Sequence, residues 1–223
     1  MDEKTALLYS RLNSYKYLVE KTKNFIENSL QQVKNPYVAC SFGKDSAVML
    51  HLVLQFNPAI PVRFASRQET NLIDNYEEVI KKWLEKGINY QEIFMESGLV
   101  KIKNQLKNSL SQGKWDSFFV GIRAEESFGR RVSLKTHGQF HKLENGIIKI
   151  SPMAWWKLND VIAYTIENNI PFLNKYKIEG FSARTTSGVP RKYIHECLAS
   201  LKDRDINSFN KLVEMFPEVK EFV

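Results

Sequence analysis

The chain has 223 residues, of which 43% are hydrophobic and 26% are charged, and its net charge at pH 7 is +7. This composition is that of a globular protein, and it excludes a fibrous, low-complexity or disordered chain. The length suits one large domain that buries its core without disulfides or metals. No apolar run approaches the ~20 residues that span a bilayer, and no signal-peptide pattern follows Met1, so we expect a cytoplasmic protein without membrane contact.

The cysteines and the charge narrow the expected partners. The two cysteines, Cys40 and Cys197, form no C-x-x-C pair and are accompanied by four histidines. We therefore expect neither a disulfide framework nor zinc nor an iron–sulfur cluster. The positive net charge favours a polyanionic partner, either nucleotide or nucleic acid, although a soluble lysine-rich surface would carry the same charge.

The first half of the chain alternates between strand and helix patterns. Helical spacing of apolar residues predicts one long amphipathic helix over about 4–32, ended by Asn35-Pro36. Apolar runs predict strands at 37–41, 61–65, 90–95 and 117–122, and helices at 47–56, 72–86 and 99–110. Such alternation with short connections predicts a doubly wound, mostly parallel five-stranded sheet flanked by helices. The helix at 47–56 is apolar on nearly every side, so we expect it to be buried on both flanks.

The second half departs from this alternation after Val132. Glu144-Asn145-Gly146 predicts a hairpin turn between two short strands. An amphipathic helix is predicted from Pro152 to about residue 168, and further helices at 192–201 and 206–215. We therefore divide the chain into an N-terminal helix packed on the domain (1–34), an α/β domain (35–190) and a C-terminal helical segment (191–223).

The loop between the first strand and its helix has the composition of an anion site. It reads Ser41-Phe42-Gly43-Lys44-Asp45-Ser46, and it lies at the carboxyl end of a strand, where open α/β sheets bind ligands. Gly43 is expected to adopt a turn conformation barred to other residues, and the unpaired amides that open the helix attract an anion. Lys44 adds positive charge, and Ser41 and Ser46 add hydroxyl donors. The alternative is a tight turn whose polar residues merely cap the helix.

This loop resembles the PP-loop of N-type ATP pyrophosphatases, and in particular the branch of phosphoadenylyl-sulfate (PAPS) reductases and sulfate adenylyltransferase small subunits. Two further segments carry the resemblance. Residues 119–127, followed by Arg130 and Arg131, are similar to the branch's "G-[IL]-R-x-[ED]-[EQ]-S…R" segment, and residues 151–180 to its "P…W…DV..Y…Y..G" segment. The resemblance covers about residues 37–190 and implies the adenine nucleotide alpha-hydrolase-like fold.

The resemblance also implies a site for ATP or a related adenine nucleotide, with reaction at the α-phosphate. The implied nucleotide-binding residues are Ser41, Phe42, Gly43, Lys44, Asp45, Ser46, Gly121 and Arg123. Lys44, Asp45 and Arg123 are the implied catalytic residues. Arg123 would face the phosphates from the end of a later strand, and its alternative is a surface ion pair with Glu125 or Glu126. Asp45 would help to order Mg²⁺, or would only cap the helix.

A second anionic group or substrate is expected nearby. The candidate residues are Glu126, Arg130, Arg131, Arg184, Thr185 and Thr186. The alternative for both segments is an ordinary solvated polar loop. Trp156 and Tyr164 are expected to pack in the core and not to stack on a base.

Two departures from the family pattern bear on the reaction. Where the superfamily often carries Asp-Thr-Gly at the end of the second strand, this chain has Ala-Ser-Arg-Gln-Glu-Thr at 65–70, with the acidic residue displaced to Glu69. The reductases' Glu-Cys-Gly-Leu-His tail is represented only by Glu196-Cys197. Because Cys197 falls within a predicted helix, we expect it to be a small buried hydrophobe, which disfavours thiol-dependent reduction.

Two functions stay open. The first is an ATP pyrophosphatase, adenylyl-transferring or sulfonucleotide-processing enzyme of the PAPS reductase family. The second is a non-catalytic module that binds nucleotide or nucleic acid, as part of a modification system whose sulfur-handling partner is another chain. An acidic partner protein and a second copy of the chain are further expected partners. A phosphate-tracking surface could use Lys101, Lys103, Lys107, Lys114, Arg130, Arg131, Lys135 and Lys142.

Overall fold

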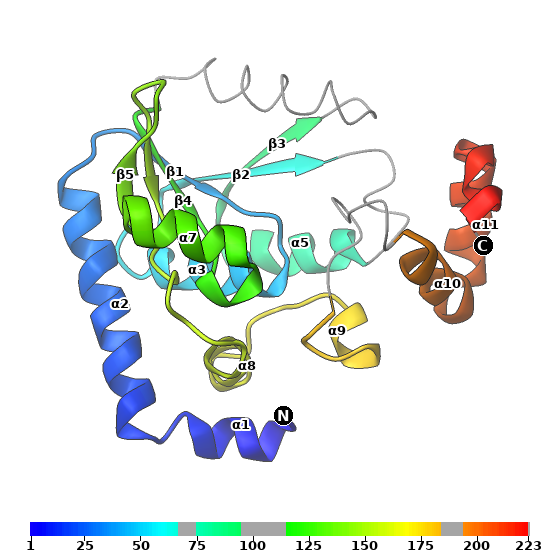
Figure 1. Ribbon diagram of the computed structural model, residues 1–223, viewed down its shortest axis with the longest axis horizontal. Helices are drawn as coiled ribbons and strands as arrows, with labels where there is room; N and C mark the ends of the chain where they lie inside the picture. The colour runs from blue at the N-terminus through cyan, green and yellow to red at the C-terminus, as the bar shows by residue number, and fades with distance from the viewer. Residues whose placement is uncertain (67–74, 95–114, 184–193, 223) are drawn as a thin grey trace.

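A computed structural model of the chain describes residues 1–66, 75–94, 115–183 and 194–222. At its centre is a six-stranded sheet in the order β3-β2-β1-β4-β6-β5 (Figure 1). The strands are β1 (Pro36–Ala39), β2 (Pro61–Ser66), β3 (Asn89–Phe94), β4 (Ser117–Val120), β5 (Phe140–Lys142) and β6 (Ile148–Ile150). The expected mostly parallel, doubly wound α/β fold is confirmed, with one strand more than the five predicted.

The central strand is β1, which is parallel to both of its neighbours. Val38 lies opposite Val62 of β2 on one side and Phe119 of β4 on the other. The pairs β2–β3 and β4–β6 are also parallel, whereas β5 and β6 are antiparallel. The predicted turn at 144–146 joins β5 to β6, and Gly146 takes a φ of +86° there. The hairpin therefore adds β5 as an antiparallel edge strand to an otherwise parallel sheet.

Helices surround the sheet. They are α1 (Glu3–Tyr9), α2 (Asn13–Gln31), α3 (Lys44–Leu54), α5 (Tyr76–Leu84), α7 (Phe128–His137), α8 (Leu158–Glu167), α9 (Lys175–Ile178), α10 (Ile194–Arg204) and α11 (Ile206–Met215), with short 3₁₀ turns η1 (Ala124–Glu126) and η3 (Pro217–Phe222). Right-handed crossovers from β1 to β2 and from β2 to β3 place α3 and α5 on the same face of the sheet. The helix predicted at 99–110 lies outside the described residues.

Helix α3 lies deepest in the molecule, as its apolar sequence predicts. It packs against both α2 and α8, and its residues from Lys44 to Leu50 are all buried. Trp156 and Tyr164 lie against one another in this core, with ring centroids 5.7 Å apart, so the core interpretation of both is confirmed. None of the helices in the described ranges is both long and apolar enough to cross a bilayer.

The single N-terminal helix predicted over 4–32 is wrong, because the chain bends between α1 and α2. Tertiary contacts explain the bend. Tyr9 of α1 donates a hydrogen bond of 2.8 Å to Asp160, and Tyr15 of α2 donates one of 2.9 Å to Glu167. Both carboxylates belong to α8, at its opposite ends. A straight helix would point these two tyrosines in different directions, whereas the bend lets both reach α8.

The C-terminal helices α10 and α11, both predicted, form a small core of their own with η3. Leu198, Leu201, Phe209 and Leu212 are buried together there. In Figure 1 this unit lies apart from the sheet, beside α9. Glu179, which follows α9, connects this unit to the rest of the domain. Its Oε1 accepts a 2.6 Å hydrogen bond from Ser200 Oγ and lies 3.7 Å from Arg204 Nε. Its Oε2 lies 3.7 Å from Lys175 Nζ.

A buried hydrogen bond joins α2 to the core and gives a test of this packing. Trp156 Nε1 donates to Thr22 Oγ1 over 2.8 Å. Thr22→Val removes the acceptor while keeping the shape, so we expect the free energy of unfolding to fall by about 1–3 kcal/mol. Thr22→Ser keeps the hydroxyl and should cost less. Urea unfolding measures both, and an equal loss in the two variants would show that the hydrogen bond is not what stabilises this contact.

Candidate functional site

The loop of residues 40–43 connects the carboxyl end of β1 to the first turn of α3. The expected special conformation at Gly43 is wrong, because Gly43 has an ordinary extended backbone with φ −69°. The positive φ, +52°, falls on Phe42 instead. Such a conformation is strained for a side chain of this size, and packing maintains it. The Phe42 ring is fully buried, with its centroid 5.3 Å from that of Phe64 and 6.1 Å from that of Tyr90.

The two serines of the loop lie side by side. Ser46 Oγ donates to the Gly43 carbonyl over 3.1 Å and accepts from the Ser41 amide over 3.2 Å. The two hydroxyl oxygens are 3.0 Å apart. Ser46 is buried and holds the loop closed, whereas Ser41 is exposed.

Lys44, the first residue of α3, is covered by the chain around α9. It is 9% exposed. Its amide donates to Tyr176 Oη over 3.3 Å, and its ammonium donates to the Ala183 carbonyl over 3.2 Å. The same ammonium lies 5.1 Å from the centroid of the Tyr176 ring, a cation–π distance. Tyr176 is in turn stacked on Phe181 at 5.6 Å. The first amide and the lysine of the predicted anion site are therefore both engaged by residues 176–183.

Asp45 and Arg123 form a buried ion pair. Arg123 Nε donates to Asp45 Oδ1 over 2.6 Å, and its Nη1 donates to Glu125 Oε2 over 2.6 Å. The ion pair with Glu125 considered from the sequence is present, but Arg123 itself is only 3% exposed and is also paired with the buried Asp45. Burial lowers the pKa of the Arg123 guanidinium, but Asp45 and Glu125 outweigh it, so that the pKa is raised and the charge is held. The Asp45 carboxylate is turned toward Arg123 and Lys44, and among the described residues no amide of α3 donates to it.

Gly121 brings the end of β4 against the first turn of α3. A Cβ atom at this position would lie 2.8 Å from the Asp45 carbonyl oxygen and 2.8 Å from Ser46 Cα. Real Cβ atoms do not approach backbone so closely, so glycine is required here for packing. Gly121 thus lies directly beside the loop, as expected for a residue of the same site.

The structure brings together some of the residues predicted for a second anion. Glu126 accepts from the Arg123 amide over 2.8 Å and forms an ion pair with Arg130. Arg131 lies on another side of α7 and is exposed. Arg184, Thr185 and Thr186 lie outside the described residues, as does Glu69.

Three residues near the loop were not predicted as site residues. Glu125 contacts Arg123 and also accepts from the Leu158 amide over 2.6 Å, which fixes the start of α8. Tyr176 and Ala183 hold Lys44. Tyr176 belongs to the tyrosine–glycine segment that carries the family resemblance, so the sequence contained a signal for it. The sequence indicates Glu125 as a possible partner of Arg123, but nothing in it indicates the bond of Glu125 to the Leu158 amide or the role of the Ala183 carbonyl.

The cysteines do not resemble an activated pair. Cys40 is buried beneath the loop, and burial raises the pKa of its thiol to about 12. Cys197 lies in α10 and is partly exposed, and burial raises its thiol pKa as well.

Within the ranges that the structure describes, no group of three His, Cys, Asp or Glu side chains could hold a metal ion. Both carboxylate oxygens of Asp45 face cations: Oδ1 lies 2.6 Å from Arg123 Nε, and Oδ2 lies 3.6 Å from Lys44 Nζ. That arrangement does not fit a resident Mg²⁺.

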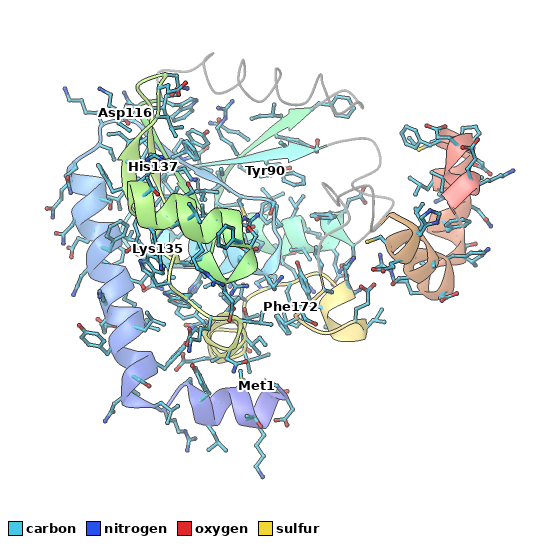
Figure 2. The ribbon with its side chains drawn as sticks, viewed as in Figure 1. Met1, Tyr90, Asp116, Lys135, His137 and Phe172 are labelled. Carbon is cyan, nitrogen blue, oxygen red and sulfur yellow. The ribbon has the colours of Figure 1, made fainter. Side chains whose placement is uncertain are left out.

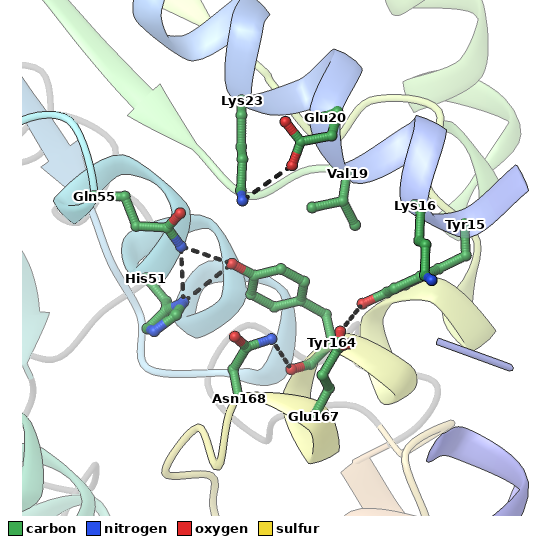
Figure 3. Close-up of a pocket in the computed structure, with 10 residues that line it drawn as sticks. All are labelled: Tyr15, Lys16, Val19, Glu20, Lys23, His51, Gln55, Tyr164, Glu167 and Asn168. Atoms are coloured by element: carbon green, nitrogen blue, oxygen red, sulfur yellow. Dashed lines mark hydrogen bonds and ion pairs between the residues drawn. The ribbon is translucent and has the colours of Figure 1, made fainter. Parts of the chain in front are cut away.

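A separate cavity of about 590 Å³ lies between α2, α3 and α8 (Figure 3). Nδ1 of His51, near the end of α3, lies 3.1 Å from Tyr164 Oη. Gln55 Nε2 donates to the same hydroxyl over 2.9 Å. Burial lowers the pKa of His51, which favours its neutral form. Because the loop lies at the other end of α3, about 16 Å away along an 11-residue helix, this cavity is not part of the loop site.

Sequence comparison relates the chain to sulfonucleotide reductases. Residues 35–182 match the profile of the phosphoadenosine phosphosulfate reductase domain. A phosphoadenosine 5'-phosphosulfate reductase of Photobacterium profundum is 25% identical over 181 residues, which are 70% of this chain and 68% of that protein. An adenosine 5'-phosphosulfate reductase of Bacillus cereus is 29% identical over 153 residues, 60% of this chain and 64% of that protein. The chain thus spans about two thirds of these relatives.

A solved structure supports the fold assignment. The FMN adenylyltransferase of Candida glabrata, in complex with FMN and the ATP analogue AMPCPP, has a TM-score of 0.61 to this chain at 15% identity. The alignment covers 78% of this chain and 66% of that one. At this identity the likeness concerns the fold.

The tight contact at Gly121 can be tested with a matched pair of variants. Gly121→Ala places a methyl group against the backbone of α3, so we expect the free energy of unfolding to fall by about 1–3 kcal/mol. Gly129→Ala is the control, because a Cβ atom there meets nothing within 4 Å. Its position within α7 should make it neutral or stabilising by up to about 1 kcal/mol. Thermal unfolding measures both, and equal stability of the two variants would contradict the close approach of β4 and α3.

Proposed function

The chain belongs to the phosphoadenosine phosphosulfate reductase domain family, and on that basis we propose that it is an enzyme that binds ATP or a related adenine nucleotide at residues 41–46 and acts at the α-phosphate. One observation carries the proposal. The start of α3, with Lys44 and Asp45, meets Arg123 from the segment that follows β4, at the carboxyl edge of the sheet. Two cationic side chains and a helix N-terminus thereby converge on one place, as a polyphosphate requires.

Each group has a proposed role. Lys44 and the first amides of α3 would hold the outer phosphates together with the Ser41 hydroxyl, while Ser46 would keep the loop in shape. Gly121 would let the first turn of α3, with its amides, lie against the end of β4. Arg123 would stabilise charge that develops on the α-phosphate, as preorganised donors do in phosphoryl transfer. Asp45 would keep the guanidinium in place, because the 2.6 Å bond fixes its orientation before any ligand arrives.

The proposed reaction is a displacement at the α-phosphorus. An acceptor oxygen attacks that atom, the bond to the bridging oxygen breaks, and pyrophosphate leaves with the bonding electrons. The chain's contribution is positioning and charge stabilisation. Because Asp45 is held by two cations, Mg²⁺ enters only as part of the Mg–nucleotide substrate, and no step passes through a metal held by the protein.

Lys44 has to exchange partners when a nucleotide binds. Its ammonium lies against the Ala183 carbonyl and the Tyr176 ring, and its amide is taken by Tyr176 Oη. A phosphate is a stronger partner for an ammonium than a neutral carbonyl is. We therefore expect residues 176–183 to shift when the nucleotide arrives.

Sulfonucleotide reduction is the alternative, because both relatives described above carry that activity in their names. It would require a nucleophilic thiolate. The raised pKa of Cys197 and its place within α10 do not support this role.

The role of Lys44 is tested by Lys44→Ala. We expect the affinity for Mg–ATP to fall by about 10-fold or more, since one charge-assisted contact to phosphate is lost. The ATP-dependent rise in melting temperature measures this affinity, and pyrophosphate release measures turnover. Lys21→Ala, on the exposed face of α2, is the control. If Lys44→Ala and Lys21→Ala bind ATP equally well, the proposed phosphate site is refuted.

Cys197→Ser separates the two chemistries. Displacement at the α-phosphorus uses no thiol, so we expect pyrophosphate release by this variant to stay within about 2-fold of the unmodified chain, because the serine replaces a side chain that carries no charge. Sulfite release from PAPS in the presence of a dithiol is measured in parallel. Sulfite production that disappears in Cys197→Ser would instead establish thiol-dependent reduction and overturn the proposed chemistry.

A further inference from the structure

One face of α7 carries apolar and basic side chains that point away from the core. Phe128 is 79% exposed and Val132 is 45% exposed, which is unusual for such side chains. Arg131 and Lys135 are also exposed. The four positions are spaced i, i+3, i+4 and i+7, so they lie on the same side of the helix. Figure 2 shows Lys135 on α7, at the front of the molecule.

The opposite side of α7 attaches the helix to the domain. Leu134 is buried and packs with Ala124 and Ala154. His137, at the end of α7, stacks on His141 of β5 with ring centroids 5.1 Å apart. The face formed by Phe128, Arg131, Val132 and Lys135 is therefore not needed to hold α7 in place.

The charge on this face is positive and unneutralised. Helix α7 contains three basic residues and no acidic one. Arg130 has its partner in Glu126. The side chains of Arg131 and Lys135 form no hydrogen bond or ion pair with any residue that the structure describes.

We propose that Phe128, Arg131, Val132 and Lys135 form a surface that binds single-stranded nucleic acid. The cations would contact successive phosphates, and the open ring of Phe128 would stack on a base. In a duplex the base faces are already stacked, so Phe128 would have no partner. An acidic protein is less well matched, because the centre of a protein interface is depleted of charge, whereas here cations separate the two apolar side chains.

The position of this surface relates it to the nucleotide site. Helix α7 begins directly after η1, and Arg123 precedes that turn. A strand on α7 would thus pass close to the end of β4. The surface does not depend on the proposed reaction, since phosphate and base contacts require no nucleotide at the loop.

The test is fluorescence anisotropy with the full chain and labelled 20-mers, as single-stranded DNA, single-stranded RNA and duplex DNA, without ATP. We expect at least one single strand to bind more tightly than the duplex, with an affinity that falls steeply as salt rises. Arg131→Glu/Lys135→Glu should weaken binding by about 10-fold or more, and the loss of two phosphate contacts should reduce the salt slope by about 1.4. Phe128→Ala should weaken binding by about 5-fold or more through lost stacking.

The control is Lys21→Glu/Lys211→Glu, which changes the net charge equally at two exposed positions away from α7. Circular dichroism checks that each variant is folded. The proposal is overturned if neither single strand binds at low salt, if the control weakens binding as much as the α7 pair, or if the duplex binds as tightly as the single strands. Displacement of the oligonucleotide by poly-glutamate of equal charge, as readily as by unlabelled oligonucleotide, would also overturn it.

Discussion

The ion pair between Asp45 and Arg123 is the constraint on which the rest of the site depends. Both charges are out of water, and a buried charge is tolerated only when a partner of opposite sign and good geometry accompanies it. The 2.6 Å bond therefore locks the first turn of α3 to the segment after β4, two parts of the chain separated by 78 residues. Gly121 permits the approach, because a side chain there would hold the strand away from the helix. Glu125 extends the same network to the first amide of α8. A single guanidinium thus aligns two helices and a strand end at one edge of the sheet.

Much of the fold could be predicted because it is encoded locally. The alternation of apolar runs defines β1 to β4 and α3, and the Asn145-Gly146 turn defines the hairpin. What could not be predicted depends on contacts between distant residues. The bend after Tyr9 exists because Tyr9 and Tyr15 reach carboxylates more than 150 residues away. The positive φ of Phe42 depends on Phe64 and Tyr90, which no local pattern associates with the loop.

In the candidate site, too, locally encoded features could be predicted from the sequence, whereas contacts between distant residues could not. The loop residues could be chosen from sequence because helix N-termini and lysine have an affinity for phosphate whatever surrounds them. Arg123 could be placed near them because parallel strands end at the same edge. Its preference for Asp45 could not be read from the sequence, where Glu125 and Glu126 are the nearer carboxylates. The family resemblance pointed to Tyr176, but its contact with Lys44 and that of the Ala183 carbonyl could not be predicted, because both residues lie more than 130 positions away along the chain.

The family match begins at residue 35, yet the cooperative unit of the molecule begins earlier. Thr22 of α2 accepts the hydrogen bond of the Trp156 indole. Tyr9 of α1 and Tyr15 of α2 donate hydrogen bonds to carboxylates of α8. The first amide of α8, that of Leu158, in turn donates to Glu125, which also binds the Arg123 guanidinium. A fragment that began at residue 35 would uncover one flank of α3 and leave a buried indole N–H without a partner. The span of the family match is therefore shorter than the packed unit, because α1 and α2 cover α8 and α3 from outside that span.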